Sequence, residues 1–314
     1  MNQRILIFAP IAFFALAGLC AAAEGNPAAA QPTRDIRSVA ADLTVPPMTR
    51  EEPAPGRRVR QVTPGYEQTQ VYHALYLPTD WQPGRRYPVL VEYMGNGPYH
   101  GAWGDYSSGR LEDTQLGYGI SAGKRFLWVA LPYLNGAGTD TVTQWWGDPG
   151  KWQVEPTLDY CRKTVRGVCE KFGGDPDALI LTGFSRGAIA CNYLGLYNDE
   201  IARLWRAFIP FSHYDGLERW PYHHNDRASA VERLKRLGGR SQFILSESGF
   251  TNAGTVDSIE RYLKSTGVEA RVTLMGTGFR NHDAAWILRP SPARDAVRKW
   301  LDDLLAKGPV PAAR

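Results

Sequence analysis

The segment from Ala178 to Ala188 constrains the fold of this chain more than any other. Its first residues, Ala-Leu-Ile-Leu-Thr, form a short apolar run that predicts a buried strand. The run leads into Gly183-Phe184-Ser185-Arg186-Gly187, and the small residues beyond it can begin a helix. A strand, a sharp Gly-x-Ser-x-Gly turn and a helix form a nucleophile elbow, whose glycines leave room where a Cβ would collide with neighbouring backbone. We therefore predict that Ser185 projects its hydroxyl above the sheet edge as a candidate nucleophile, at the positive end of the helix.

The first residues, 1–23, predict a secretory signal peptide. Arg4 precedes an almost wholly apolar stretch over residues 5–19, and Ala21-Ala22-Ala23 supplies a small-residue cleavage site. The apolar stretch is short for a membrane span, so we expect no stable membrane insertion after the peptide is removed. The mature protein is then predicted to be secreted or periplasmic. Lipidation at Cys20 is a minor alternative, because Leu19 before it is a poor fit to such a site.

Composition divides the rest of the chain into two parts. Residues 24–58 are rich in alanine, proline and charge and have little apolar periodicity, which predicts a flexible leader. Residues 59–314, roughly 250 residues, are enough for one domain with a sizeable core. The formal net charge of +4 is mild and argues against nucleic acid as a partner.

Three cysteines lie beyond the predicted signal peptide. Cys161 and Cys169 fall eight residues apart on one predicted helix, which is too far for a bond between them. Either of them can reach Cys191 if the two helices that carry these residues pack side by side. The predicted export makes one such disulfide reasonable, and the odd number leaves at least one thiol unpaired.

Predicted strands and helices alternate along the remaining chain. Apolar runs predict strands over residues 70–77, 87–93, 126–132, 178–182, 205–211, 242–245 and 270–275. Apolar residues at helical spacing predict helices over residues 155–172, 188–196, 228–237, 255–264 and 293–305. This alternation implies a mostly parallel sheet covered by helices on both faces.

With the elbow at mid-chain, this order of elements resembles the α/β-hydrolase fold. The stretch from Phe172 to Gly187, which reads Phe-Gly-Gly-Asp-Pro-Asp-Ala-Leu-Ile-Leu-Thr-Gly-Phe-Ser-Arg-Gly, is similar to secreted esterases related to polyhydroxyalkanoate depolymerases, feruloyl esterases and acetylxylan esterases. The resemblance covers nearly all of the chain from about Val59 onward. It implies a serine hydrolase for carboxylic esters that needs no cofactor and no metal.

A serine hydroxyl needs a base within hydrogen-bond reach, and the fold implies the chain order serine, acid, histidine. Among six histidines, His282 alone follows the last predicted core strand. The acid should follow the strand over residues 242–245. Asn252 occupies the place where the family usually carries an aspartate, so the acid must come from another residue. Glu247 is our first candidate, and Asp257 and Asp215 are alternatives.

The resemblance also implies two donors for the oxyanion of the tetrahedral intermediate. One is the backbone N–H of Arg186, the residue after the nucleophile. The second is assigned to Asn96, by its backbone or its side chain, because Gly95-Asn96-Gly97 stands where these enzymes carry a His-Gly-Gly type of sequence. The Arg186 side chain is expected in a structural ion pair.

Aromatic residues mark the expected substrate side. Trp145 and Trp146 lie in a loop predicted at the carboxyl ends of the strands, where exposed indoles form platforms for sugar or aromatic rings. Packing of these tryptophans onto the core is the alternative. A second insert over residues 217–226 is a candidate cap, and glycines near Tyr99 to Tyr106 suggest a further wall. His223 and His224 are adjacent and therefore point apart, which argues against a metal site.

These patterns support two hypotheses. The first is an exported serine esterase acting on a small-molecule or polysaccharide ester, or on a polyester; because the same triad cleaves amides, a serine peptidase is a related possibility. The second is a non-catalytic carbohydrate-binding protein on a hydrolase scaffold, which the ambiguous acid supports.

Overall fold

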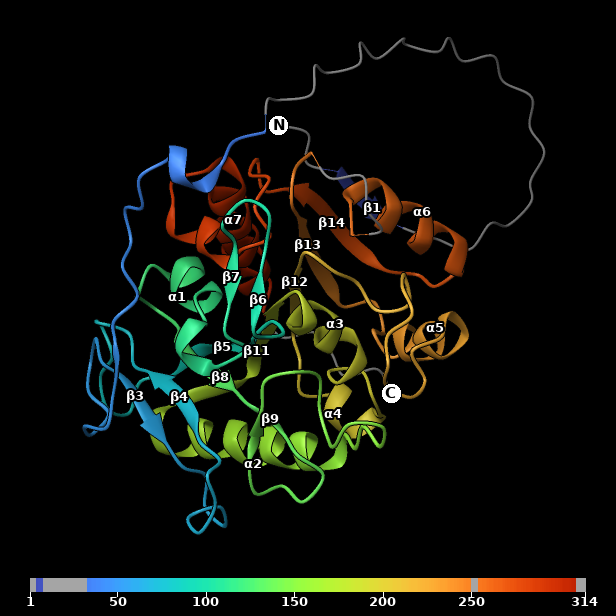
Figure 1. The fold of residues 1–314 in the computed structure, drawn as a ribbon. Helices are drawn as coiled ribbons and strands as arrows, with labels where there is room; N and C mark the ends of the chain where they lie inside the picture. The colour runs from blue at the N-terminus through green and yellow to red at the C-terminus, as the bar shows by residue number, and fades with distance from the viewer. Residues whose placement is uncertain (1–3, 8–32, 250–253, 309–314) are drawn as a thin grey trace, which may run out of the picture.

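The centre of the protein is a large mixed sheet whose middle strands all run parallel (Figure 1). The structure, a computed structural model, describes residues 4–7, 33–249 and 254–308. Within these ranges ten strands form the sheet, in the order β1 (Arg4–Ile7), β14 (Arg271–Gly276), β13 (Ser241–Ser246), β12 (Ala207–Phe211), β11 (Gly174–Phe184), β5 (Tyr87–Tyr93), β8 (Leu127–Leu131), β4 (His73–Tyr76), β3 (Arg58–Gln61) and β2 (Met48–Thr49). The six strands from β14 to β8 are parallel, as the alternation of strands and helices predicts.

Helices cover both faces of this sheet. One face carries α2 (Glu155–Phe172), α3 (Arg186–Tyr193), α5 (Arg227–Lys235) and α6 (Val256–Thr266). The other carries α1 (Leu116–Ser121), η3 (Ala284–Leu288) and α7 (Pro292–Ala306). In β5, Val89 and Val91 belong to the apolar cluster on the face that carries α2, and Leu90 belongs to the cluster on the face that carries α7. The strands are apolar on both faces because both faces are buried, so their sequences form continuous apolar runs.

Short elements complete the chain on and around the sheet. They are η1 (Ile36–Ser38), β6 (Tyr99–His100), β7 (Tyr106–Ser107), η2 (Leu111–Asp113), β9 (Tyr133–Leu134), β10 (Thr141–Val142) and α4 (Asp199–Ala202). β6 pairs with β7 and β9 with β10, each as an antiparallel pair. The β6–β7 hairpin follows the carboxyl end of β5, on the side of the sheet where the candidate site lies.

The predicted flexible leader is wrong for residues 33–58, which pack against the domain (Figure 1). Arg34 forms a parallel bridge with Phe279, Asp42 pairs with Arg294, and β2 adds a strand beside β3. Prolines exclude a helix, but they permit an extended segment that satisfies its backbone on neighbouring loops. The folded unit therefore begins before the predicted boundary at Val59.

β1 belongs to the predicted signal peptide and pairs antiparallel with β14, at one edge of the sheet. Among the residues that the structure describes, helices are all too short or too polar to cross a bilayer.

His73, in β4, gives the fold a predicted sensitivity to acid. Its Nδ1 atom lies 3.0 Å from the hydroxyl oxygen of Tyr160, and burial lowers the pKa of His73 to about 3. Because the unfolded chain binds this proton near pH 6.5 and the folded protein does not, stability should fall as pH drops from 6.5 toward 3. Between pH 6.5 and 5, urea unfolding should show that the free energy of unfolding falls by roughly 1–2 kcal/mol more in wild type than in His73→Asn. Equal losses in the two proteins would contradict this assignment.

Candidate active site

The turn between β11 and α3 holds Ser185 in a strained conformation. Its φ is 55° and its ψ is −113°, and its N–H donates to the carbonyl of Phe211 at 3.0 Å. A positive φ at a non-glycine residue costs about 1–3 kcal/mol and is maintained only by its surroundings. A Cβ at Gly187 would lie 2.0 Å from the Tyr93 carbonyl oxygen, and one at Gly183 would lie 2.3 Å from the Gly187 carbonyl carbon. Both glycines are therefore required by close backbone approach.

Three side chains meet at the carboxyl edge of the sheet. Ser185 Oγ lies 3.1 Å from His282 Nε2, and His282 Nδ1 lies 2.7 Å from Glu247 Oε1. Ser185 follows β11, Glu247 follows β13 directly, and His282 lies in the loop after β14. Parallel neighbouring strands deliver their carboxyl ends to one edge, which brings residues from distant parts of the sequence together. The arrangement brings a candidate nucleophile, a candidate base and a carboxylate that can orient the base within hydrogen-bond reach of one another.

Glu247 is a buried carboxylate, with its side chain 5% exposed. Burial alone would raise the pKa of Glu247, but hydrogen bonds from His282 and Ser212 and the charge on His282 outweigh burial and lower it. The acid therefore stays ionised at neutral pH and can stabilise a positive charge on the histidine.

The alternative acids lie elsewhere. Asp215 is buried and pairs with Arg233, whose Nε and Nη2 lie 2.8 and 3.1 Å from its two carboxylate oxygens. Asp257 is exposed in the first turn of α6. Asn252, at the position where the resemblance expects an acid, lies outside the described residues. Of the three candidate acids, Glu247 is the one that the structure brings to His282.

Ser212 is a residue near the histidine that the sequence analysis missed. It follows β12, and its hydroxyl lies 3.0 Å from His282 Nδ1, the nitrogen that also faces Glu247. The next residue, His213, has its ring centroid 5.4 Å from that of His282, and burial lowers the pKa of His213 to about 4. His213 is therefore neutral at neutral pH. Ser212 and His213 could have been identified as site candidates because they directly follow the buried parallel strand β12.

The candidate oxyanion donors lie at the starts of two segments. Arg186 is the first residue of α3, and first-turn amides of a helix have no carbonyl partner within the helix. Asn96 follows β5, and its Oδ1 accepts a hydrogen bond from the Trp145 N–H at 2.9 Å. The side-chain oxygen of Asn96 therefore holds the neighbouring loop, and its backbone N–H is the better candidate for an oxyanion.

The buried Arg186 side chain holds the surrounding loops together, and within the described part of the chain it does so without the expected ion pair. Its guanidinium donates to the carbonyls of Trp145 at 2.7 Å and Gly95 at 2.9 Å, and it lies 3.8 Å from the ring centroid of Tyr133. Burial lowers the pKa of Arg186 to about 10, so the group remains protonated at neutral pH. Arg186 thus provides a candidate oxyanion donor through its backbone N–H, and its side chain fixes the loop that carries the other candidate, Asn96.

The expectation of exposed platforms at Trp145 and Trp146 is wrong. Trp146 is fully buried and Trp145 is 8% exposed. Trp146 stacks on Tyr193 of α3 at 4.7 Å, and both indoles contact Tyr222 in the 217–226 insert. Large aromatic rings gain more by filling this space than by facing solvent, so the alternative of core packing holds.

Exposed aromatic rings gather instead on the β6–β7 hairpin. Tyr99, Trp103 and Tyr106 are 38%, 40% and 49% exposed. The Tyr99 ring centroid lies 5.2 Å from that of His282, edge to face. Arg280, two residues before the histidine, lies over the Trp103 ring at 3.9 Å. The wall suggested by the glycines of this stretch is therefore an aromatic surface beside the triad.

The possible disulfide to Cys191 is not formed, because Cys161, Cys169 and Cys191 are all free thiols. Burial raises the pKa of Cys161 to about 12 and that of Cys169 to about 11. At neutral pH these thiols are protonated and unreactive. Within the described ranges, His, Cys, Asp and Glu side chains form no group of three suited to hold a metal ion.

Comparison with known proteins identifies the fold. No protein-family model and no curated protein matches the chain. Esterase 2 of Thermogutta terrifontis, in a structure phosphorylated by paraoxon, has a TM-score of 0.52 at 15% identity, over 83% of this chain and 97% of that chain. Dipeptidyl peptidase 4 of Porphyromonas gingivalis has a TM-score of 0.50 at 14% identity, over 81% of this chain and 36% of that chain.

A thermostable esterase aligns with a TM-score of 0.47 at 16% identity, over 78% of this chain and 62% of that chain. This chain thus spans less than two thirds of two of these three structures. The sheet order and the similarity to esterase 2 show that the protein has the α/β-hydrolase fold, which confirms the predicted fold class. Its site joins a serine on a nucleophile elbow to a histidine and a glutamate.

Proposed function

We propose that this protein is an exported serine hydrolase that cleaves carboxylic esters. The observation that carries the proposal is the hydrogen-bonded series from Ser185 through His282 to the ionised Glu247. Export is supported by the sequence of residues 1–23.

The site chemistry follows from these contacts. Ser185 Oγ attacks the ester carbonyl while His282 Nε2, 3.1 Å away, takes the hydroxyl proton. The amides of Arg186 and Asn96 receive the negative charge on the carbonyl oxygen. His282 then gives its proton to the leaving alcohol, and an acyl group remains on Ser185. His282 takes a proton from water as the water attacks this acyl-enzyme, and it returns that proton to Ser185 Oγ as the acid leaves.

For the substrate we propose carbohydrate-linked esters or polyesters. The exposed rings of Tyr99, Trp103 and Tyr106 support a substrate with flat apolar faces, because sugar and aromatic rings stack on such surfaces. The Tyr99 ring contacts the His282 ring edge to face, and this contact supports a substrate that stacks on the hairpin while its ester group reaches Ser185.

The test is hydrolysis of short-chain and feruloyl aryl esters by the mature protein, with the matching anilides in parallel. Mass spectrometry after treatment with a fluorophosphonate probe should find the adduct on Ser185. We expect ester turnover and an adduct at this residue. Faster cleavage of anilides would favour the peptidase alternative. The absence of both turnover and labelling in a folded protein would favour the carbohydrate-binding alternative.

A further inference from the structure

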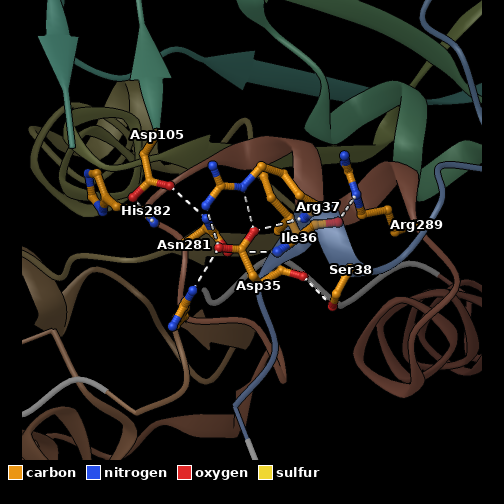
Figure 2. A network of polar contacts seen from close by, with 9 residues as sticks. Asp35, Ile36, Arg37, Ser38, Asp105, Asn281, His282 and Arg289 are labelled. Carbon is orange, nitrogen blue, oxygen red and sulfur yellow. Dashed lines mark hydrogen bonds and ion pairs between the residues drawn. The ribbon is translucent and has the colours of Figure 1, made fainter. Parts of the chain in front are cut away.

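A series of buried hydrogen bonds joins the N-terminal segment to the backbone of His282 (Figure 2). The His282 N–H donates to Asp105 Oδ2 at 3.0 Å, and Asn281 Nδ2 donates to Asp105 Oδ1 at 2.8 Å. The Asn281 Oδ1 atom in turn accepts from the Ile36 N–H at 2.8 Å. Asp105 and Asn281 are 2% and 1% exposed, so water does not replace these bonds easily.

The chemistry of the series fixes its direction. Both ends are backbone N–H groups, at Ile36 and at His282, and each needs an acceptor. Asn281 offers its oxygen to the first end and therefore presents its NH₂ to the next group. That group must accept from both sides, and an ionised carboxylate is an acceptor only. Asp105 is thus required by the pattern, and an amide there would place two donors face to face.

The N-terminal end of the series is itself held firmly. Asp35 caps η1 and pairs with Arg280 at 2.9 Å. Arg289 donates to the carbonyl of Ile36 at 2.6 Å, and the Arg34 backbone pairs with the loop that precedes His282. The Ile36 side chain is buried in the apolar cluster beneath. Segments from three parts of the sequence therefore converge on the histidine loop.

We propose that Asp105 is a positioning residue that, with Asn281 and the backbone of Ile36, fixes the His282 loop so that the ring faces both Ser185 and Glu247. This inference rests on the proposed function, because it assigns these residues to the same reaction. His282 bridges contacts of 3.1 and 2.7 Å on its two nitrogens, so a shift of its backbone lengthens at least one of them. A misplacement of about 1 Å can lower a rate about 100-fold.

Exchange of the two interior residues tests the proposal directly. Asp105→Asn puts two donors face to face, and Asn281→Asp puts two carboxylates face to face. We expect each single variant to lower kcat for an aryl ester by about 10- to 100-fold with KM within about threefold. The double variant Asp105→Asn/Asn281→Asp reverses the central hydrogen bond, satisfies both backbone ends and keeps the net charge. Its kcat should return to within about fivefold of wild type, which is a strongly non-additive result.

A second pair of variants addresses the Ile36 backbone alone. Ile36→Pro removes the N–H donor at the first residue of η1, where proline is tolerated, and Asp35 before it already has the extended conformation that proline favours, with φ −82° and ψ 138°. Ile36→Val removes a similar amount of side chain and keeps the N–H. We expect Ile36→Pro to lower kcat about three- to tenfold and Ile36→Val to stay within twofold of wild type. This pair also decides the question if an Asp105 or Asn281 variant does not fold.

A measurement without turnover separates this inference from the proposed function. The proton on His282 Nδ1 that faces Glu247 should give a downfield NMR signal, broadened or lost in the single variants and restored in the double variant. If the wild-type protein shows this signal but neither hydrolyses esters nor reacts with the fluorophosphonate probe, the proposed function is overturned. Single variants with wild-type kcat and an unchanged signal, or a double variant no better than the product of the single losses, would overturn the positioning role.

Discussion

Replacing Ser185 by alanine is expected to lower kcat for aryl esters by about a million-fold, the loss typical of removing a nucleophile from a serine triad. In the proposed mechanism the hydroxyl oxygen of Ser185 bonds to the substrate, and His282 Nε2 at 3.1 Å has no other proton to take from this residue. Alanine has the same conformational strain at φ 55° as serine, so the melting temperature should change little. Steady-state kinetics and thermal unfolding of the two proteins give both quantities.

A matched control is Ser212→Ala, which removes the other hydroxyl at the same histidine. Ser212 contacts Nδ1, on the side of the ring away from the nucleophile. We expect kcat within about tenfold of wild type, because Glu247 remains bonded to that nitrogen at 2.7 Å. Loss of the fluorophosphonate adduct in Ser185→Ala and its retention in Ser212→Ala would identify the nucleophile. Near-normal turnover by purified Ser185→Ala would refute its role.

Replacing Glu247 by glutamine is expected to lower kcat by about ten-thousand-fold, as when the acid of a serine triad becomes an amide. Glutamine keeps the shape but removes the negative charge, and its NH₂ group can turn the imidazole to the wrong tautomer. The effect is large here because the side chain is 5% exposed, so water screens the lost interaction poorly. Kinetics on the same ester panel at neutral pH measure the loss.

Two further substitutions bracket this result. Glu247→Asp keeps the charge but shortens the side chain, so its loss should be smaller, about 10- to 100-fold. Asp257→Asn changes a carboxylate that the sequence also offered as the acid, and it should alter kcat by less than about twofold because Asp257 is exposed on α6. A larger loss at Asp257 than at Glu247 would reverse the assignment.

Much of the fold could be predicted because buried strands and amphipathic helices leave local patterns. β5 and α2 occupy the predicted residues, Tyr87–Tyr93 and Glu155–Phe172. The sequence also offered Ser185 and His282 as the groups that now face one another, because their order follows from the fold. Glu247 stayed one of three candidates, since the loop after a strand has no periodicity that points one carboxylate inward.

The features that sequence patterns missed depend on contacts between distant residues. Asp105 bonds to Asn281 and His282 across more than 170 positions, and no local pattern indicates such a partner. The sequence does not indicate that Trp145 and Trp146 are buried, because a loop tryptophan gives no pattern that distinguishes an exposed indole from one packed on a neighbouring ring. The proline-rich stretch over residues 33–58 also differs from the sequence-based prediction, because its order comes from contacts with loops elsewhere in the chain.

The guanidinium of Arg186 has a consequence for redesign of this protein. Because the guanidinium donates to the carbonyls of Gly95 and Trp145, the loop after β5 and the loop after β10 depend on each other for their positions. A library that varies residues 95–97 to admit a larger acyl group would also alter the anchor of residue 145 and, through its indole, the 217–226 insert. Redesign of this site should therefore vary both loops together and leave position 186 unchanged.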